Sequence, residues 1–414
     1  MSTPRISRRG LLGGGVAAAG VAGAFAVGRA SADEGDSGST AARSYAFRGE
    51  HQAGIVTPAQ DRLHFAAFDV TTDDREELIG LLQDWTAAAD RLTRGEAAGE
   101  VGPVEGDPLL PPDDTGEAIG LPPSGLTITF GFGPSLFDRF DLADRRPKAL
   151  RRLPHFPADA LDPAKSDGDL CVQACADDPQ VAVHAVRNLA RIAFGRASVR
   201  WSQLGFGRTS STSTSQETPR NLFGFKDGTA NLKAEETAAL DEHLWVGADD
   251  DPAAAWLVGG SYLCARRINM RIETWDRQPL VDQEQFIGRT KGEGGPLSGG
   301  DEFADIDFDA ITGTSPTMPV DSHVRVVHPD FHDGARMLRR GYNFVDGSDA
   351  LGGLNAGLFF IAFVRDPDTH FIPIQNTMAK TDALMEYLKT TGSALFAVPP
   401  GIGEGEYVGQ ALFE

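Results

Sequence analysis

Cysteine is scarce in this chain, which has three cysteines among its 414 residues. Cys171 and Cys175 lie in a segment that is typical of a strand. Four residues along a strand span roughly 13 Å, which is far beyond the reach of a disulfide bond. Three cysteines in such an arrangement exclude a disulfide-based scaffold. We therefore expect buried thiols that behave as small hydrophobic side chains.

Basic residues are also in short supply. Lysine and arginine number 38 against 59 aspartates and glutamates, so the formal net charge is −21. A surface this acidic disfavours nucleic acid and anionic lipid as partners and favours solubility outside the cytoplasm. A chain of this length can bury a large core, as one domain or as two fused halves.

Long hydrophobic runs are absent except near the start of the chain. Ser7-Arg8-Arg9-Gly10-Leu11-Leu12 is a twin-arginine sequence, residues 13–27 are small and apolar, and Ala30-Ser31-Ala32 offers a cleavage site. We interpret residues 1–32 as a twin-arginine signal peptide. The alternative is a membrane anchor, but the glycines and alanines make this run weakly hydrophobic. Its removal takes away four arginines and no acid, and the net charge becomes −25.

The remaining chain is predicted to hold a disordered lead-in over residues 33–58 and two ferredoxin-like halves, 59–220 and 221–414. In the first half, the patterns predict β-α-β, β-α-β. The expected strands are 63–70, 126–132, 169–176 and 198–206, and the expected helices are 73–92 and one that begins at Asp178-Pro179. The loops 95–123 and 207–220 are interpreted as surface excursions, and the second borders a site.

The second half repeats this plan with longer insertions. Strands are expected at 260–272, 322–328, 339–345, 356–364 and 393–398, and helices near 278–289 and 376–390. The fold class predicted for the whole is α+β, a duplicated ferredoxin-like arrangement with antiparallel sheets and peripheral helices.

A single acid lies between glycines near the middle of the chain, in Gly224-Phe225-Lys226-Asp227-Gly228. A carboxylate in such a tight segment can act as a general acid and base toward a bound substrate. The alternative is an Asx-turn or a helix cap, because Asp-Gly is a common turn dipeptide.

An imidazole follows about a hundred residues later. His323 is placed on the predicted strand 322–328, and a neutral imidazole facing a cavity can ligate haem iron while the opposite position stays open. A hydrogen-bonded core histidine is the alternative. A site of several histidines with His328 and His332 is disfavoured, because His323 and His328 point to opposite faces of a strand.

A guanidinium is available sixteen residues further on. Arg339 could stabilise the negative charge that develops as a peroxide O–O bond breaks, or it could form a surface ion pair. Arg340 points to the other face of the strand. Arg289 is a candidate partner for a haem propionate. No C-x-x-C-H sequence occurs, which excludes covalently attached haem.

These segments resemble the dye-decolourising (DyP-type) haem peroxidase family. Gly224 to Gly228 is similar to the G-x-x-D-G motif of that family, and His323 and Arg339 match its proximal ligand and distal arginine in order and approximate separation. Residues 245–247, 256–262 and 338–343 also resemble family blocks. The likeness covers residue 60 to the C-terminus, and the twin-arginine leader points to the exported branch, which includes deferrochelatases.

The resemblance implies one non-covalent haem b per chain, with His323 as the axial ligand, Asp227 as the distal acid–base residue and Arg339 as the distal cation. The choice of Arg339 over Arg336 or Arg340 depends on the Arg-Arg-Gly-Tyr context. Further haem contacts are expected from Gly228, Thr229, Ala230, Arg289, His328, Pro329 and Asp330. Glu386 is the expected carboxylate behind the proximal imidazole. Tyr342 and Tyr387 are candidate electron carriers near the surface.

Three functions are compatible with this pocket. The first is a peroxidase that reduces hydrogen peroxide and oxidises organic substrates such as dyes and phenols. The second is a deferrochelatase that releases iron from haem with the porphyrin intact, and the third is a non-catalytic haem carrier. The expected partners are peroxide and a small organic reductant or haem. We expect no nucleic acid and no stable membrane insertion after signal cleavage. The sequence leaves the formation of a homo-oligomer undecided. The expected location is periplasmic or extracellular.

Overall fold

The structure, a computed structural model, describes residues 43–350 and 352–414. The predicted signal peptide 1–32 lies outside the described residues, as does the first part of the predicted lead-in. The described remainder of that lead-in is not a detached segment. Phe47, Gln52 and Ile55 are buried, and the Gln52 side chain donates to the carbonyls of Phe130 and Pro399. The prediction of disorder is therefore wrong for residues 43–58.

Two sets of four antiparallel strands form the centre of the molecule, and each has the ferredoxin-like order fourth–first–third–second. The first set runs β4-β1-β3-β2, with β1 (Arg62–Val70), β2 (Thr127–Phe132), β3 (Leu170–Ala176) and β4 (Ala197–Arg208). The second set runs β11-β5-β10-β9, with β5 (Ser261–Met270), β9 (Tyr342–Ser348), β10 (Leu354–Val364) and β11 (Leu388–Val398). The predicted fold class is confirmed.

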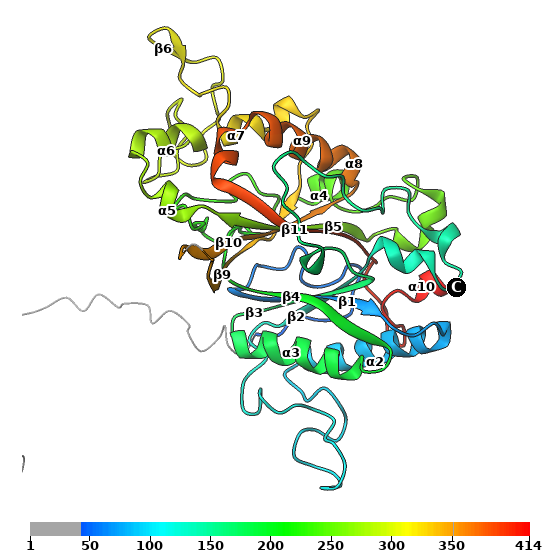
Figure 1. Ribbon diagram of the computed structural model, residues 1–414. Coiled ribbons are helices and arrows are strands. Elements are labelled where there is room, and N and C mark those ends of the chain that lie inside the picture. Colours follow the sequence, from blue (N-terminus) through cyan, green and yellow to red (C-terminus); the bar gives the residue numbers. More distant parts are fainter. Residues whose placement is uncertain (1–42, 351) are drawn as a thin grey trace, which may run out of the picture. The chain divides into compact units, whose positions relative to one another are not determined.

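The two sets join at short seams and close into a barrel-like sheet. β11 meets β2 at the pair Ala397–Phe132, and β4 meets β9 around Phe206 and Asn343. A two-residue strand, β8 (Leu338–Arg339), is added at the outer side of β10. The two sets are adjacent layers in Figure 1. The exact boundary that we placed between residues 220 and 221 stays a prediction.

Strand alternation explains how this core is divided. Along β1, Leu63, Phe65 and Ala67 point into the space between the two layers, where they meet side chains of β5, β9, β10 and β11. The alternate residues, among them Phe68, pack against helices. The three cysteines are buried and free, as predicted.

Helices cover the outer faces of the two layers (Figure 1). α2 (Arg75–Thr93) and α3 (Pro179–Ile192) cover the first set, and Asp74 and Asp178 cap their first turns. The helices of the second half are short: α4 (Thr237–His243), α5 (Ile272–Trp275), α6 (Leu280–Ile287), α7 (His323–Val326), α8 (Pro367–His370), α9 (Ile372–Thr381) and α10 (Gln410–Phe413). The 3-10 turns lie at 134–138, 143–145, 163–165, 252–257, 329–331 and 383–387, and a small hairpin pairs β6 (Ile311–Thr312) with β7 (Ser315–Pro316).

Two predicted elements differ from the structure. Residues 322–328 are not a strand, because Val324, Arg325 and Val326 belong to the single-turn helix α7, which ends before Pro329. The predicted helix 376–390 is broken at Asp382, which caps the 3-10 turn Ala383–Tyr387 (η6). In the described part of the chain, no helix is both long and apolar enough to cross a membrane.

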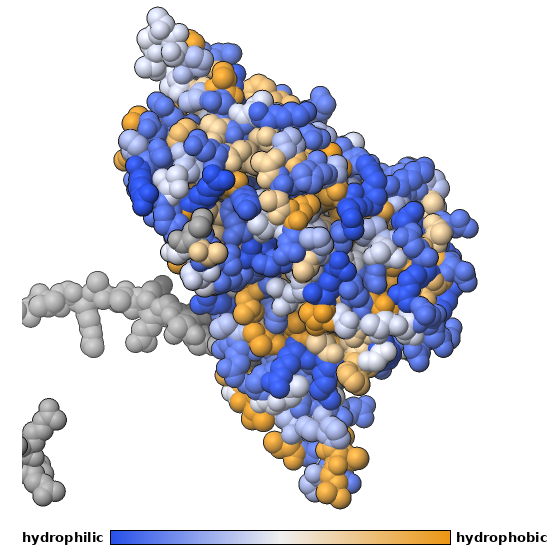
Figure 2. All heavy atoms as spheres, in the orientation of Figure 1, coloured by the Kyte–Doolittle hydropathy of each residue, from blue (hydrophilic) through white to orange (hydrophobic). Residues whose placement is uncertain are grey.

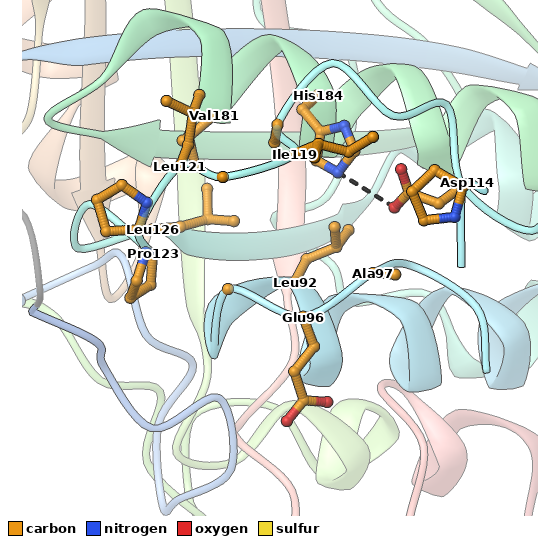
Figure 3. A pocket seen from close by; sticks show the side chains of 15 residues that line it. Leu92, Glu96, Ala97, Asp114, Ile119, Leu121, Pro123, Leu126, Val181 and His184 are labelled. Carbon is orange, nitrogen blue, oxygen red and sulfur yellow. Dashed lines mark ion pairs between the residues drawn. The ribbon is translucent and has the colours of Figure 1, made fainter. Parts of the chain in front are cut away.

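The predicted surface loops behave differently from each other. The loop 95–123 carries exposed apolar side chains such as Leu109 and Leu110. The lower projection in Figure 2 shows orange, hydrophobic spheres. Its base encloses a pocket of about 170 Å³, where the buried Asp114 carboxylate lies 3.2 Å from Nε2 of His184 (Figure 3). In the loop 207–220, by contrast, residues 209–213 are buried, so this segment is not a surface excursion along its whole length.

Candidate active site

The Asp227 segment is a tight hairpin that presents one carboxylate. The Asp227 backbone N–H donates to the Pro219 carbonyl at 2.9 Å. Gly228 has a φ of +88°, and a β-carbon there would lie 2.9 Å from Cα of Ser210. Only glycine fits this backbone without strain. Phe223 and Phe225 are buried against Trp275, with ring centroids 4.3 and 5.9 Å away, so the hairpin is anchored by its apolar side chains.

Arg339 lies against this carboxylate. Its Nη1 is 3.0 Å from Oδ1 of Asp227. Asn231 fixes the Arg339 backbone from the other side, accepting from the Arg339 N–H at 2.7 Å and donating to the Arg339 carbonyl at 2.9 Å. Acid and cation are therefore held by one short stretch of chain, residues 227–231.

The two neighbouring arginines are committed elsewhere. Arg336 pairs with Glu236 at 3.1 Å. Arg340 is completely buried and donates to the Ile55 and Thr57 carbonyls and to the Gln60 side chain. The structure thus brings Arg339, and neither of its neighbours, to Asp227.

His323 begins helix α7 and does not lie on a strand. Its Nδ1 is 2.7 Å from Oδ2 of Asp382, a carboxylate whose side chain has no solvent exposure. A carboxylate at Nδ1 fixes the ring orientation and leaves Nε2 available to a metal. In the described chain, no side chain or carbonyl is hydrogen bonded to Nε2 of His323.

Glu386 is therefore not the carboxylate behind His323, and that prediction is wrong. Glu386 is exposed on the turn η6. Asp382 performs two tasks at once, because its Oδ1 accepts the Leu384 N–H at 2.8 Å while Oδ2 faces His323. The same residue breaks the helix that we predicted to be continuous, so both errors have one cause.

The charges of the Asp227–Arg339 pair also act on the imidazole of His323. Burial lowers the pKa of His323, but the Asp382 carboxylate more than offsets this, and the pKa is raised. Asp227 adds a further increase in this pKa and Arg339 a decrease. Both groups therefore belong to the electrostatic environment of the imidazole. All three side chains keep partial exposure, between 15% and 27%.

A second cationic group lies at the edge of this region. Arg289 is buried, and its Nη1 donates to the carbonyls of Gly294 and Glu302 at 2.7 Å. Among the described residues, no carboxylate forms an ion pair with it. The Glu302 side chain accepts from Thr229 at 3.1 Å and pairs with Lys226. Glu302 therefore connects Arg289 to the Asp227 hairpin.

The other predicted cofactor residues lie in two turns. Thr229 and Ala230 continue the Asp227 hairpin, and His328 precedes the 3-10 turn Pro329–Phe331 (η5). Burial lowers the pKa of His328; Asp330 opposes this shift and the charge of Arg289 adds to it. Tyr342 and Tyr387 are both buried, so neither is a surface residue as we had expected.

Sequence reasoning missed three polar residues of the site. Asp382 supports His323, Asn231 holds the Arg339 backbone, and Asn221 donates to Oδ2 of Asp227 at 3.1 Å. A signal for the two asparagines was present, since each lies within six residues of Asp227 in a turn-rich segment. Asp382 gave none, because it is 59 residues from its partner.

Comparison with known proteins identifies the family. Residues 52–207 match the Dyp-type peroxidase, N-terminal family model, and residues 218–403 match Dyp-type peroxidase, C-terminal. The chain belongs to the Dyp-type peroxidase family. As a member of it, the protein is an oxidoreductase of the haem-binding peroxidase type.

Relatives agree over almost the whole length of the chain. It is 39% identical over 372 residues to a deferrochelatase from Escherichia coli strain K12, covering 88% of this chain and 86% of that protein. Ferric DtpA from Streptomyces lividans is 42% identical, with a TM-score of 0.83 and coverage of 90% and 98%. A DyP-type peroxidase from Cellulomonas bogoriensis is 38% identical, with a TM-score of 0.80 and coverage of 91% and 99%.

The adjacent arginines of this Dyp-type peroxidase are expected to contribute unequally to its stability. Arg340→Leu removes a donor from buried acceptors and should lower the free energy of unfolding by about 2–4 kcal/mol. Arg339→Leu should lower it by less than about 1 kcal/mol, because the Arg339 side chain is partly exposed. Urea denaturation of both variants measures this difference. Equal losses of stability would contradict the separation of roles.

Proposed function

We propose that this protein is a haem b-dependent peroxidase that reduces hydrogen peroxide and oxidises organic reductants such as dyes and phenols. One non-covalent haem per chain would be held by His323. The observation that carries the proposal is two pairs of side chains: Asp382 with the His323 imidazole, and Arg339 with Asp227.

The residues present fit this cofactor. A neutral imidazole with Nδ1 bonded to a carboxylate is a strong axial donor through its other nitrogen. Arg289, buried and without a carboxylate partner among the described residues, suits a propionate. Residues 228–230 and 328–330 supply the turns that would follow the porphyrin edge. When bound, haem supplies an iron centre that takes peroxide and stores its two oxidising equivalents.

Side chains of the protein then transfer the proton and stabilise the developing negative charge. Asp227, as a carboxylate, would accept a proton from one oxygen of hydrogen peroxide and return it to the other oxygen, which leaves as water. Arg339 donates hydrogen bonds to the departing oxygen and stabilises its negative charge. Asp382 keeps the His323 ring in one orientation throughout.

Removing either distal group should slow the reaction with peroxide. We expect Asp227→Asn to reduce the second-order rate of the Soret change by about 10²–10⁴-fold, because no base remains at that position. Arg339→Leu should reduce the rate by about 10²–10³-fold. Stopped-flow absorption with the haem-loaded protein measures both.

Asp250→Asn is a matched control, because Asp250 also pairs with an arginine, Arg365 at 2.6 Å, but is not part of the site. Its rate should stay within about twofold of the parent. If Asp227→Asn and Arg339→Leu also react like the parent, the proposed roles are wrong and a non-catalytic haem carrier becomes the better description.

Asp382→Asn tests the support of the axial ligand. The amide oxygen can still cap Leu384, but the anion behind His323 is lost. We expect the haem dissociation constant to rise about 10–100-fold, as measured by transfer of haem to an excess of apomyoglobin. Glu386→Gln is the control and should bind haem like the parent. Equal weakening in both variants would refute the role of Asp382.

Export by the twin-arginine route, to the periplasm or the medium, is part of the proposal. It is supported by Arg8-Arg9, the apolar run after them and the cleavage site at Ala32. The acidic composition favours solubility there. Peroxide and a small organic reductant are the proposed partners.

Iron release from haem is the second candidate, because a relative 39% identical to this chain is named a deferrochelatase. Anaerobic incubation of the haem-loaded protein without peroxide separates the two functions. The peroxidase proposal predicts that the iron stays in the porphyrin. Metal-free porphyrin fluorescence appearing together with one equivalent of iron would establish the second activity.

A further inference from the structure

We infer that Asn221 is a positioning residue for the proton acceptor of the peroxide reaction. Its side-chain amide holds the Asp227 carboxyl group in the orientation that receives a proton. This inference rests on the proposed function and deepens it. It assigns the orientation of Asp227 to a neighbour that carries no charge.

The orientation of the Asn221 amide is fixed by its own backbone. Its Oδ1 accepts the Phe223 N–H at 3.0 Å, which forms an Asx-turn. The NH₂ group must therefore point the other way, where Nδ2 lies 3.1 Å from Oδ2 of Asp227. The opposite flip would leave the Phe223 N–H facing another donor and bring two oxygens together, so it is excluded.

Both oxygens of Asp227 are thus served by donors. Arg339 binds Oδ1 and Asn221 binds Oδ2. Hydrogen bonds to the charged form of a carboxyl group favour that form. They also fix the plane of the carboxylate, so the remaining lone pairs point in set directions. A proton acceptor needs both conditions before the substrate arrives.

Other charged groups near Asp227 are engaged with different partners. Lys226, its neighbour in the chain, is paired with Glu302, and His323 is paired with Asp382. Arg339 is the cation in direct contact with Asp227. A substitution at residue 221 therefore changes the hydrogen bonding of Asp227 and leaves these other ion pairs in place.

The backbone of the hairpin is held by other hydrogen bonds besides that of the Asn221 side chain. Arg220 donates to the carbonyls of Gly224, Lys291 and Gly292 at 2.6–2.8 Å. The Asp227 N–H is held by the Pro219 carbonyl. Substitution at 221 is thus expected to change the hydrogen bond to Asp227 while the hairpin stays in place.

Asn221→Asp is the sharpest test, because it keeps the shape and the acceptor of the Asx-turn. It replaces the donor by an oxygen opposite Oδ2 of Asp227. Two carboxylates at this distance cannot both ionise readily, and they share a proton up to a higher pH. The acid limb of the peroxide reaction should therefore move to higher pH by about one unit or more.

The measurements are the pH titration of the Asp227 carboxyl group in the haem-free protein, followed by infrared difference spectroscopy against Asp227→Asn, and the stopped-flow rate of the Soret change of the haem-loaded protein with hydrogen peroxide. Both cover pH 4 to 9. Asn221→Ser is a second variant, in case the first binds haem poorly. Its hydroxyl can accept the Phe223 N–H but is too short to reach Asp227. Loss of the donor alone should move the acid limb in the same direction by a smaller amount, about half a unit.

Asp227→Asn, measured in parallel, separates the possible failures. If it slows the reaction but neither variant of Asn221 moves the acid limb, the inference is wrong and the proposed function stands. If Asp227→Asn does not slow the reaction, the proposed function fails and the inference fails with it. A rate that falls equally at every pH in both Asn221 variants would mean a purely structural role, and would also refute the inference.

Discussion

The Asp382 carboxylate has no solvent exposure, so each of its oxygens needs a partner within the candidate active site. Isolation of such a charge from water costs several kcal/mol. The structure meets this cost with the His323 ring on one oxygen and the Leu384 N–H on the other. The imidazole is thereby locked with one nitrogen bound and one free. The break between α9 and η6 and the orientation of the His323 ring both depend on Asp382.

Asp227 and Arg339 are held together in a different way. Asp227 and Arg339 are 112 residues apart in the chain, yet Asn231 connects their two segments. Its side chain bonds to the Arg339 backbone as a neighbouring strand would. Its amide binds both the N–H and the carbonyl of Arg339. The hairpin and β8 therefore form one unit, and the separation between acid and cation is set by short-range bonds. Such preorganisation matters because catalytic groups must be in place before the charge develops.

Much of the fold could be predicted because strand alternation and helix capping are local signals. Asp178-Pro179 marked the start of α3, and β2 and β10 were visible as alternating and continuous apolar runs. The predictions were wrong where a contact between residues far apart in the sequence determines the local structure. Val324 and Val326 looked like strand residues, but α7 is stabilised by packing against neighbours that the sequence does not reveal. The Asp227–Arg339 contact was predicted through a motif, whereas the partner of His323 lay in a predicted helix whose break depends on tertiary structure.

Arg340, the residue after Arg339, binds a segment near the start of the described chain. Successive side chains point to opposite faces, so Arg340 turns inward and takes its acceptors from residues 55–60, near the start of the described chain. Residues 55–60 thus complete the hydrogen bonding of the cation next to Arg339. Proteolytic trimming past Thr57 would remove the Ile55 and Thr57 carbonyls and leave the buried Arg340 with fewer acceptors.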